Sequence, residues 1–313
     1  MNRHPSRALL AIVLLSLVAA PACRPWRSPA SPYRRVETEP RLSVFVHETR
    51  ETQEMPMEEY LLGVVAGEME PDWPLEALKA QAVLARTFTI EALQRKGGTR
   101  ESTGTDVSTS ETEFQAYDAS KISDIVRRAV AETRGQILVD GRGNPVRAYF
   151  HADAGGKTAT ADEGLGFREV PTSYLKVNPA PSNNPDASWT ASFSLAEIAT
   201  AVRQVKPGAN LGQVNRVAIA ARGPSGRATQ IQVGNVRVSA VALRMALGPK
   251  EMKSTMLESL TLGGGQVTMK GRGFGHGVGM PQWSARLLAD QGTMAAAILG
   301  RFFAGTRVDQ WWR

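Results

Sequence analysis

Glycine fills every second position from Gly271 to Gly279, and this spacing limits the possible folds more than any other feature of the chain. In an extended segment, a period of two places all the glycines on one face and the other side chains on the opposite face. The pattern predicts that a helix or a flat ligand passes close to the bare glycine face. The segment is neither a dinucleotide-binding fingerprint nor a phosphate loop, because neither G-x-G-x-x-G nor G-K-[ST] can be placed on it.

The residues that follow this segment, together with one histidine inside it, form a set that is typical of sugar-binding sites. Pro281 is expected to begin a helix, with Gln282 and Trp283 in its first turn. An indole stacks on the face of a pyranose ring, while an amide and the neutral imidazole of His276 bond hydroxyl and acetamido groups. The alternative for His276 is a structural histidine whose hydrogen bonds are satisfied inside the protein.

Glu68 is the candidate for acid chemistry. It follows an apolar run over residues 61–66 and precedes Trp73. Loss of hydration beside apolar groups raises the pKa of a carboxyl and lets it hold a proton near neutral pH, as a general acid must. The alternative is a solvated glutamate that closes a helix.

Prolines divide this region into two predicted helices. Pro56 begins the first, Pro71 ends it, and Pro74 begins the second. The second helix is rich in alanine, which allows close packing against a neighbour. Gln81 and Arg86 are unusual in such a helix, and we interpret them as inward-facing site residues or, equally, as a solvated flank.

The charge of the chain argues against a nucleic-acid partner. Of its 313 residues, 42% are hydrophobic and the formal net charge is +7. Six of the 37 basic residues and no acid precede Val36, which leaves 31 basic residues against 30 acids in the remainder. A nearly neutral remainder does not provide a phosphate-binding surface.

The first residues are predicted to direct export. Residues 1–22 have the basic start, short apolar run and small residues of a signal peptide. Cleavage there would leave Cys23, the only cysteine, at the new N-terminus, which suggests a lipid anchor in the membrane, with simple secretion as the alternative. Residues 23–40, rich in proline and arginine, are predicted to be a flexible tether. We therefore expect a protein of the cell envelope or periplasm that has no disulfides.

The remaining pattern predicts an α+β fold. We expect a core over residues 41–185, a smaller inserted α+β subdomain over residues 186–265, and a return to the core over residues 266–313. The expected elements are a strand at 41–47 followed by a polar hairpin or loop, a helix at 120–134, strands at 136–139 and 146–151, and, in the insert, helices at 195–204 and 239–247 and strands at 214–221 and 228–233.

Taken together, these stretches resemble the SpoIID/LytB family, which includes stage II sporulation protein D lytic transglycosylases and LytB amidase enhancers. The motifs that carry the resemblance lie at residues 59–69, 76–87, 114–117, 133–135, 151–158 and 271–283. The resemblance implies one catalytic core with Glu68 as its acid. The candidate substrate-binding residues are Gln81, Arg86, Gln115, Tyr117, His151, Gly275, His276, Gln282 and Trp283.

The resemblance further implies cleavage between MurNAc and GlcNAc of peptidoglycan glycan strands. Glu68 would protonate the bridging oxygen and then take the proton of the C6 hydroxyl of the same MurNAc, which closes to a 1,6-anhydro end. Most glycoside hydrolases need two carboxylates for their reaction.

Two alternatives to this activity stay open. One is a non-catalytic peptidoglycan-binding enhancer of a cell-wall amidase. The other is a metal-dependent hydrolase built on His47, His151 and His276, but these residues lack the spacing of metal ligands, and we expect neither a metal nor another cofactor.

Overall fold

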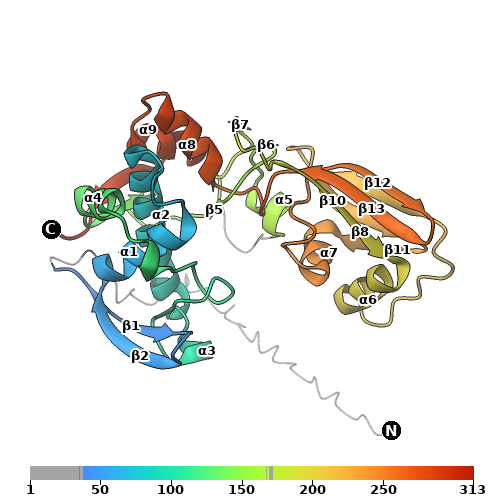
Figure 1. Ribbon diagram of the computed structural model, residues 1–313, viewed down its shortest axis with the longest axis horizontal. Coiled ribbons are helices and arrows are strands. Elements are labelled where there is room, and N and C mark those ends of the chain that lie inside the picture. Colours follow the sequence, from blue (N-terminus) through green and yellow to red (C-terminus); the bar gives the residue numbers. More distant parts are fainter. Residues whose placement is uncertain (1–34, 36–37, 167, 169–171) are drawn as a thin grey trace, which may run out of the picture. The chain divides into compact units, whose positions relative to one another are not determined.

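The computed structural model describes residues 35, 38–166, 168 and 172–313, and it has an α+β fold (Figure 1). The predicted signal peptide and Cys23 lie outside the described residues. Within the described part of the chain, no helix combines the length and the apolar character that crossing a bilayer requires.

The end of the predicted tether is held in place. Glu39 accepts a hydrogen bond from the backbone N–H of Glu58 at 2.8 Å and pairs with Arg134. Pro40 accepts the N–H of Met57 at 3.0 Å. These contacts fix the chain just before the first strand, and the limit of the predicted tether at residue 40 stays a prediction.

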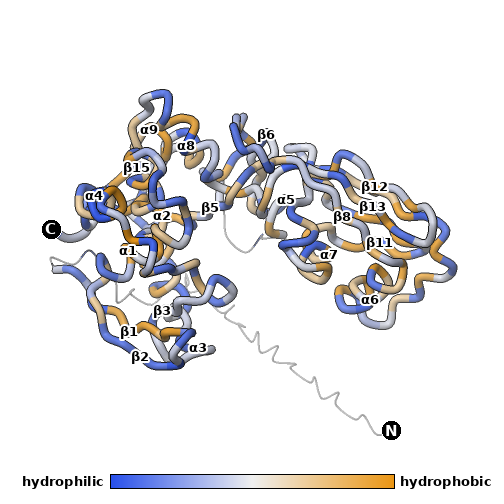
Figure 2. The backbone as a smooth tube through the Cα atoms, viewed as in Figure 1, coloured by the Kyte–Doolittle hydropathy of each residue, from blue (hydrophilic) through white to orange (hydrophobic). Residues whose placement is uncertain are grey.

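The chain begins its fold with a small mixed sheet. Strand β1 (Arg41–Val46) pairs antiparallel with β2 (Glu51–Pro56) and parallel with β3 (Val107–Ser108). Figure 2 shows a hydrophobic β1 beside a hydrophilic β2. The sequence predicted a polar hairpin or loop for the segment that forms β2. A polar edge strand forms there because its backbone pairs with β1 along its whole length.

The two predicted helices form where the prolines place them. Helix α1 (Met57–Glu68) follows Pro56, and α2 (Leu75–Lys96) follows Pro74 and ends at Gly97 in the left-handed region. Both helices are largely buried, because α1 and α2 pack against each other and α2 also packs against α4 (Asp124–Glu132), α8 (Gln282–Asp290) and α9 (Ala295–Phe302).

The next segments complete the first hydrophobic core, which draws its residues from 42–180 and 278–312. The helix predicted over 120–134 is shorter than expected, because the side chain of Ser123 caps α4. The strand predicted over 146–151 forms only at its end. The elements are α3 (Arg100–Thr103), the 3-10 helix η1 (Ala119–Lys121), α4 (Asp124–Glu132), β4 (Gln136–Val139), β5 (Phe150–His151), β6 (Gly156–Lys157), α5 (Ala161–Leu165), β7 (Pro179–Ala180), β14 (Met280–Pro281), α8 (Gln282–Asp290), α9 (Ala295–Phe302) and β15 (Arg307–Gln310).

A second hydrophobic core draws its residues from 189–269. It contains two three-stranded sheets, in the orders β11-β10-β9 and β12-β13-β8. The last strand of this core ends at Arg272, so its sheet continues beyond the predicted limit of the insert at residue 265. The domain boundaries themselves stay predictions. The elements are β8 (Ser188–Ser194), α6 (Leu195–Val205), β9 (Val217–Arg222), β10 (Ala228–Val233), β11 (Val236–Ser239), α7 (Ala240–Leu247), β12 (Leu257–Gly263) and β13 (Gln266–Arg272).

The alternating glycines do not form the extended segment that their period predicts. Gly273, Gly275, Gly277 and Gly279 all have positive φ, between 77° and 115°, in the region that side chains other than glycine avoid. The atoms that approach these glycines belong to the chain over residues 149–155 and to the guanidinium of the buried Arg227, and not to a helix or a flat ligand. The prediction of a close approach was therefore right, and its expected partner was wrong.

Candidate active site

Glu68 is the last residue of α1, and its side chain is only partly exposed. Its Oε1 accepts the backbone N–H of Ala116 at 2.9 Å, and its Oε2 accepts the side-chain amide of Gln282 at 3.3 Å. Burial raises the pKa of Glu68 to about 7, although both hydrogen bonds act in the opposite direction. The exposed carboxylate of Glu111 raises this pKa further. The carboxyl can therefore hold a proton near neutral pH and release it again.

The segment with Ala116 lies directly on α1 because the helix presents glycine to it. A Cβ atom on Gly63 would overlap the ring of Tyr117, and one on Gly67 would come within 2.7 Å of the Tyr117 backbone nitrogen. This close packing fixes the N–H of Ala116 against the carboxyl of Glu68.

Aromatic and amide side chains lie in the segment around Ala116 or pack against it. Tyr117 stacks on Tyr60 with the ring centroids 5.7 Å apart. Burial raises the pKa of Tyr60, and the charge of Glu68 adds to the effect, so the phenol stays protonated. Gln115 is buried and donates to the hydroxyl of Thr89, while its Oε1 has no partner among the described residues.

Sequence reasoning did not assign Tyr60 to the site. Its position in the motif at residues 59–69 is the one signal that would have indicated it, because the motif also contains Glu68.

Helix α8 supplies the other side of the Glu68 environment. Gln282 is buried, and Trp283 is half-buried. The indole of Trp283 meets that of Trp73 edge to face, with ring centroids 5.0 Å apart. The guanidinium of Arg286 lies 5.2 Å from the centre of the Trp73 ring and 4.9 Å from that of Trp283. The structure thus brings Glu68, Gln282 and Trp283 together, although about 200 residues separate them along the chain.

His276 and His151 lie beside each other, with ring centroids 5.1 Å apart. Nδ1 of His276 accepts the N–H of Val278 at 3.0 Å, and the imidazole also bonds the backbone of Phe150. Burial lowers the pKa of His276 to about 3, so the ring is neutral, as predicted. Its bonds to the backbone correspond to the structural alternative, and its binding of sugar stays a prediction.

His151 is also held by the backbone. Its Nδ1 donates to the carbonyl of Val278 at 3.2 Å, and burial holds its pKa well below the usual range. A Cβ on Gly275 would come within 2.7 Å of the Cβ of His151, so Gly275 permits this packing. Neither His151 nor His276 is hydrogen-bonded to Glu68, and their roles in substrate binding stay predictions.

Arg86 has a structural role. Its guanidinium is fully buried and makes two hydrogen bonds to Glu58, at 3.1 and 2.6 Å, and one to the carbonyl of Gln136 at 2.9 Å. Oε1 of Glu58 also accepts the indole N–H of Trp312 at 3.1 Å. These contacts use the charge of Arg86 inside the core, and they correct the prediction that it binds substrate.

Gln81 is fully buried as well. Neither atom of its amide has a hydrogen-bond partner among the described residues. A side chain without exposed surface does not reach a ligand in this conformation, so the predicted substrate contact of Gln81 is not supported.

The histidines do not fit a metal site. Among the described residues, no group of three or more His, Cys, Asp or Glu side chains is arranged to hold a metal ion. Nδ1 of His151 and both nitrogens of His276 are engaged by the backbone, and His47 lies on an exposed turn, bonded through its backbone to Thr109.

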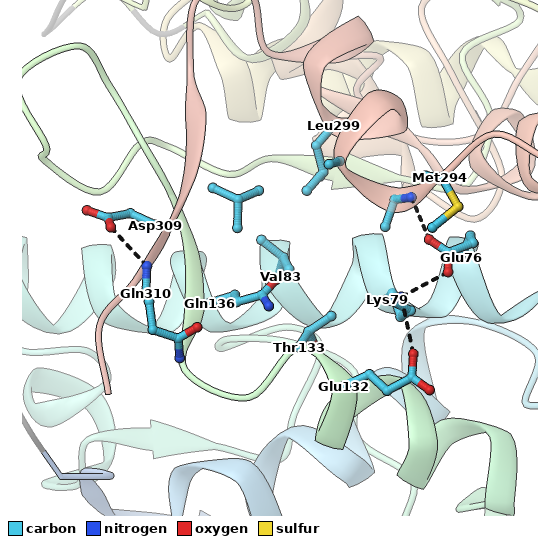
Figure 3. A pocket seen from close by; sticks show the side chains of 13 residues that line it. Glu76, Lys79, Val83, Glu132, Thr133, Gln136, Met294, Leu299, Asp309 and Gln310 are labelled. Atoms are coloured by element: carbon cyan, nitrogen blue, oxygen red, sulfur yellow. Dashed lines mark hydrogen bonds and ion pairs between the residues drawn. The ribbon is translucent and has the colours of Figure 1, made fainter. Parts of the chain in front are cut away.

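A cavity of about 380 Å³ opens elsewhere, between α2, α4, α9 and β15 (Figure 3). Lys79 lies between Glu76 and Glu132, at 2.9 and 3.2 Å, and Glu76 also accepts the N–H of Ala295 at 2.7 Å. The charged groups at this end of the cavity thus pair with one another. Glu68 does not line it.

Known proteins are similar to this chain in sequence. A family model described as stage II sporulation protein, SpoIID, matches residues 46–139, and a domain of unknown function, DUF8618, matches residues 179–279. Stage II sporulation protein D of Bacillus amyloliquefaciens is 31% identical over 86% of this chain and 79% of its own length. The protein of that name from Bacillus subtilis is 30% identical over 86% and 79%. The amidase enhancer of B. subtilis is 25% identical over 79% of this chain and 40% of its own length.

The fold and the site define an α+β protein that positions one protonatable carboxyl between two helices distant in sequence. The chain belongs to the SpoIID family. The resemblance seen in the sequence motifs is thereby confirmed.

Proposed function

We propose that this protein remodels the bacterial cell wall as a lytic transglycosylase that cleaves the MurNAc–GlcNAc bond of peptidoglycan glycan strands. The observation that carries the proposal is the partly buried carboxyl of Glu68, which the N–H of Ala116 and the amide of Gln282 hold in place and whose pKa burial raises to about 7. A general acid works best when its pKa lies near the working pH, because it can then donate a proton and accept one in turn.

The surroundings of Glu68 favour a reaction with one carboxyl. Glu111, the carboxylate whose charge raises the pKa of Glu68, is exposed and forms an ion pair with Lys250 at 3.0 Å. No hydrogen bond between Glu111 and Glu68 is present. Hydrolysis by two carboxylates needs both of them at the scissile bond, whereas an internal hydroxyl of the sugar can replace the second one.

In this mechanism protonated Glu68 donates to the bridging oxygen as positive charge develops at C1 of MurNAc. The C1–O bond breaks, and GlcNAc leaves with the proton. The carboxylate of Glu68 then accepts the proton of the C6 hydroxyl, whose oxygen bonds C1 and gives the 1,6-anhydro end. The N–H of Ala116 and the amide of Gln282 stabilise the carboxylate after it has lost its proton.

The test compares Glu68→Gln with Glu70→Gln. Both changes remove one negative charge, and Glu70 is exposed two residues further on. We expect Glu68→Gln to lower the formation of anhydro ends by about a hundredfold or more, measured by mass spectrometry of products from purified glycan strands. Glu70→Gln should act as the wild-type protein does. Anhydro ends formed by Glu68→Gln at the wild-type rate would refute the enzymatic proposal.

A second candidate function rests on the similarity to the amidase enhancer of B. subtilis. In this case the chain binds glycan strands and stimulates a separate cell-wall amidase without an acid of its own. Amidase stimulation that persists in Glu68→Gln, from a wild-type protein that forms no anhydro ends, would support this function.

We also propose that the chain is exported and held at the membrane of the cell envelope by a lipid on Cys23. The support is the sequence pattern of residues 1–22. Labelling with a fatty-acid analogue should mark the wild-type protein and not Cys23→Ser. Equal labelling of both would contradict the anchor.

A further inference from the structure

Arg286 lies against two indoles next to the candidate active site. Its guanidinium carbon is 5.2 Å from the centre of the Trp73 ring and 4.9 Å from that of Trp283. The two rings hold the planar cation in one place, and such stacking leaves the edge of a guanidinium able to donate hydrogen bonds.

The protein itself uses little of this donor capacity. Nε of Arg286 is buried without an acceptor among the described residues. In the part of the chain that the structure describes, the carboxylate within 4 Å is that of Asp290, one turn along α8, with Oδ2 at 3.9 Å from Nε, too far for a hydrogen bond. By contrast, the buried Arg86 donates to both oxygens of Glu58 and to the carbonyl of Gln136.

Arg286 is partly exposed and lies on the same helix as Gln282, which bonds Glu68. The side chain is 34% exposed, and because Nε is buried, the exposed surface lies on other atoms, which include the two terminal nitrogens. Arg286 follows Gln282 by four residues on α8, which places both on the same side of the helix. The amide of Gln282 lies 3.3 Å from Glu68. An anion on a ligand that contacts Glu68 can therefore meet Arg286.

We propose that Arg286 binds a carboxylate of the substrate glycan and so positions the muramyl residue against Glu68. The proposal rests on the proposed function. Two sources supply this chemistry: the lactyl group of a MurNAc that carries no peptide, and the stem peptide of one that does. A guanidinium forms paired hydrogen bonds with either carboxylate.

The test measures binding in the Glu68→Gln background, where strands stay uncleaved. The probes are glycan strands without stem peptides and strands with them, each also in a form whose carboxylates are neutralised as methylamides. Arg286→Gln and Arg286→Lys are compared with Arg237→Gln, which removes an exposed cation on β11. Tryptophan fluorescence reports binding, and thermal unfolding checks that each variant is folded.

We expect the parent protein to prefer charged strands to neutralised strands by about tenfold or more. Arg286→Gln should remove this preference, Arg286→Lys should retain part of it, and Arg237→Gln should leave it unchanged. The strand type that shows the effect identifies the source of the carboxylate.

Two results would overturn the role of Arg286: a preference that survives Arg286→Gln, or an equal loss of affinity for charged and neutralised strands, which indicates that the arginine only supports the tryptophans. The cleavage assay of the wild-type protein stands apart from this test. A wild-type protein that forms no anhydro ends refutes the proposed function, whereas cleavage combined with either result above refutes only the role of Arg286.

Discussion

Replacing Glu68 by glutamine should make the protein more stable at alkaline pH. An ordinary glutamate has a pKa of 4.5, and burial raises that of Glu68 to about 7 in the folded protein. Between these values the folded state binds a proton that the unfolded state does not bind. The free energy of unfolding therefore falls as pH rises from about 4.5 to about 7, and it changes little with this group above that range.

The size of the effect follows from the two pKa values. At about 1.4 kcal/mol for each pH unit, the wild-type protein loses about 3 kcal/mol of stability from this one group. Glutamine has no proton to lose, and its carbonyl oxygen can still accept the N–H of Ala116. Glu68→Gln should therefore match the wild-type protein at pH 4.5 and exceed its stability by about 3 kcal/mol at pH 8.

Urea unfolding of both proteins, followed by tryptophan fluorescence at pH 4.5 and pH 8, measures this difference. All other titrating groups are common to the two proteins and cancel in the comparison. Glu70→Gln serves as the control and should show no pH-dependent gain. A stability difference that is the same at both pH values, or a wild-type protein that is the more stable one at pH 8, would refute the claim that folding raises the pKa of Glu68.

Three further predictions concern the same core. Because Glu68 must be protonated to donate, kcat/KM for glycan cleavage should fall about tenfold for each pH unit above about 7, and a constant value up to pH 9 would contradict its role as the acid. Arg86→Met should lower the free energy of unfolding, measured in urea, by about 3–5 kcal/mol, because it leaves Glu58 buried without its cation. The double variant with Glu58→Leu should recover much of this loss. Unchanged stability together with weaker glycan binding would restore a substrate role for Arg86. Gly63→Ala should displace Tyr117 and lower activity at least tenfold, since the added methyl group overlaps its ring, and full activity would show that this close packing is unimportant.

The sequence predicted the parts of the site that depend on local chemistry. The prolines at 56 and 74 marked the starts of α1 and α2, because proline suits the start of a helix. The apolar run before Glu68 indicated its burial. The contact between Glu68 and Gln282 joins residues 214 positions apart, and no local pattern contains it. It was anticipated only because both motifs occur together in one family.

Other features could not be predicted because the sequence does not identify the partner. Glu58 has the position of an acid that favours a helix N-terminus, and nothing local indicates that Arg86 and Trp312 approach it. Alternating glycines suggested a strand, but a period of two does not distinguish an extended backbone from one with positive φ at alternate residues. In both cases tertiary contacts decide between conformations that the local sequence allows equally.

The environment of Glu68 is assembled from three separate parts of the chain: the end of α1, the segment at Ala116 and the start of α8. A polypeptide that has not yet added α8 lacks the amide of Gln282 and the indole of Trp283 in this environment. All three parts are therefore together only in a chain whose C-terminal helices have docked.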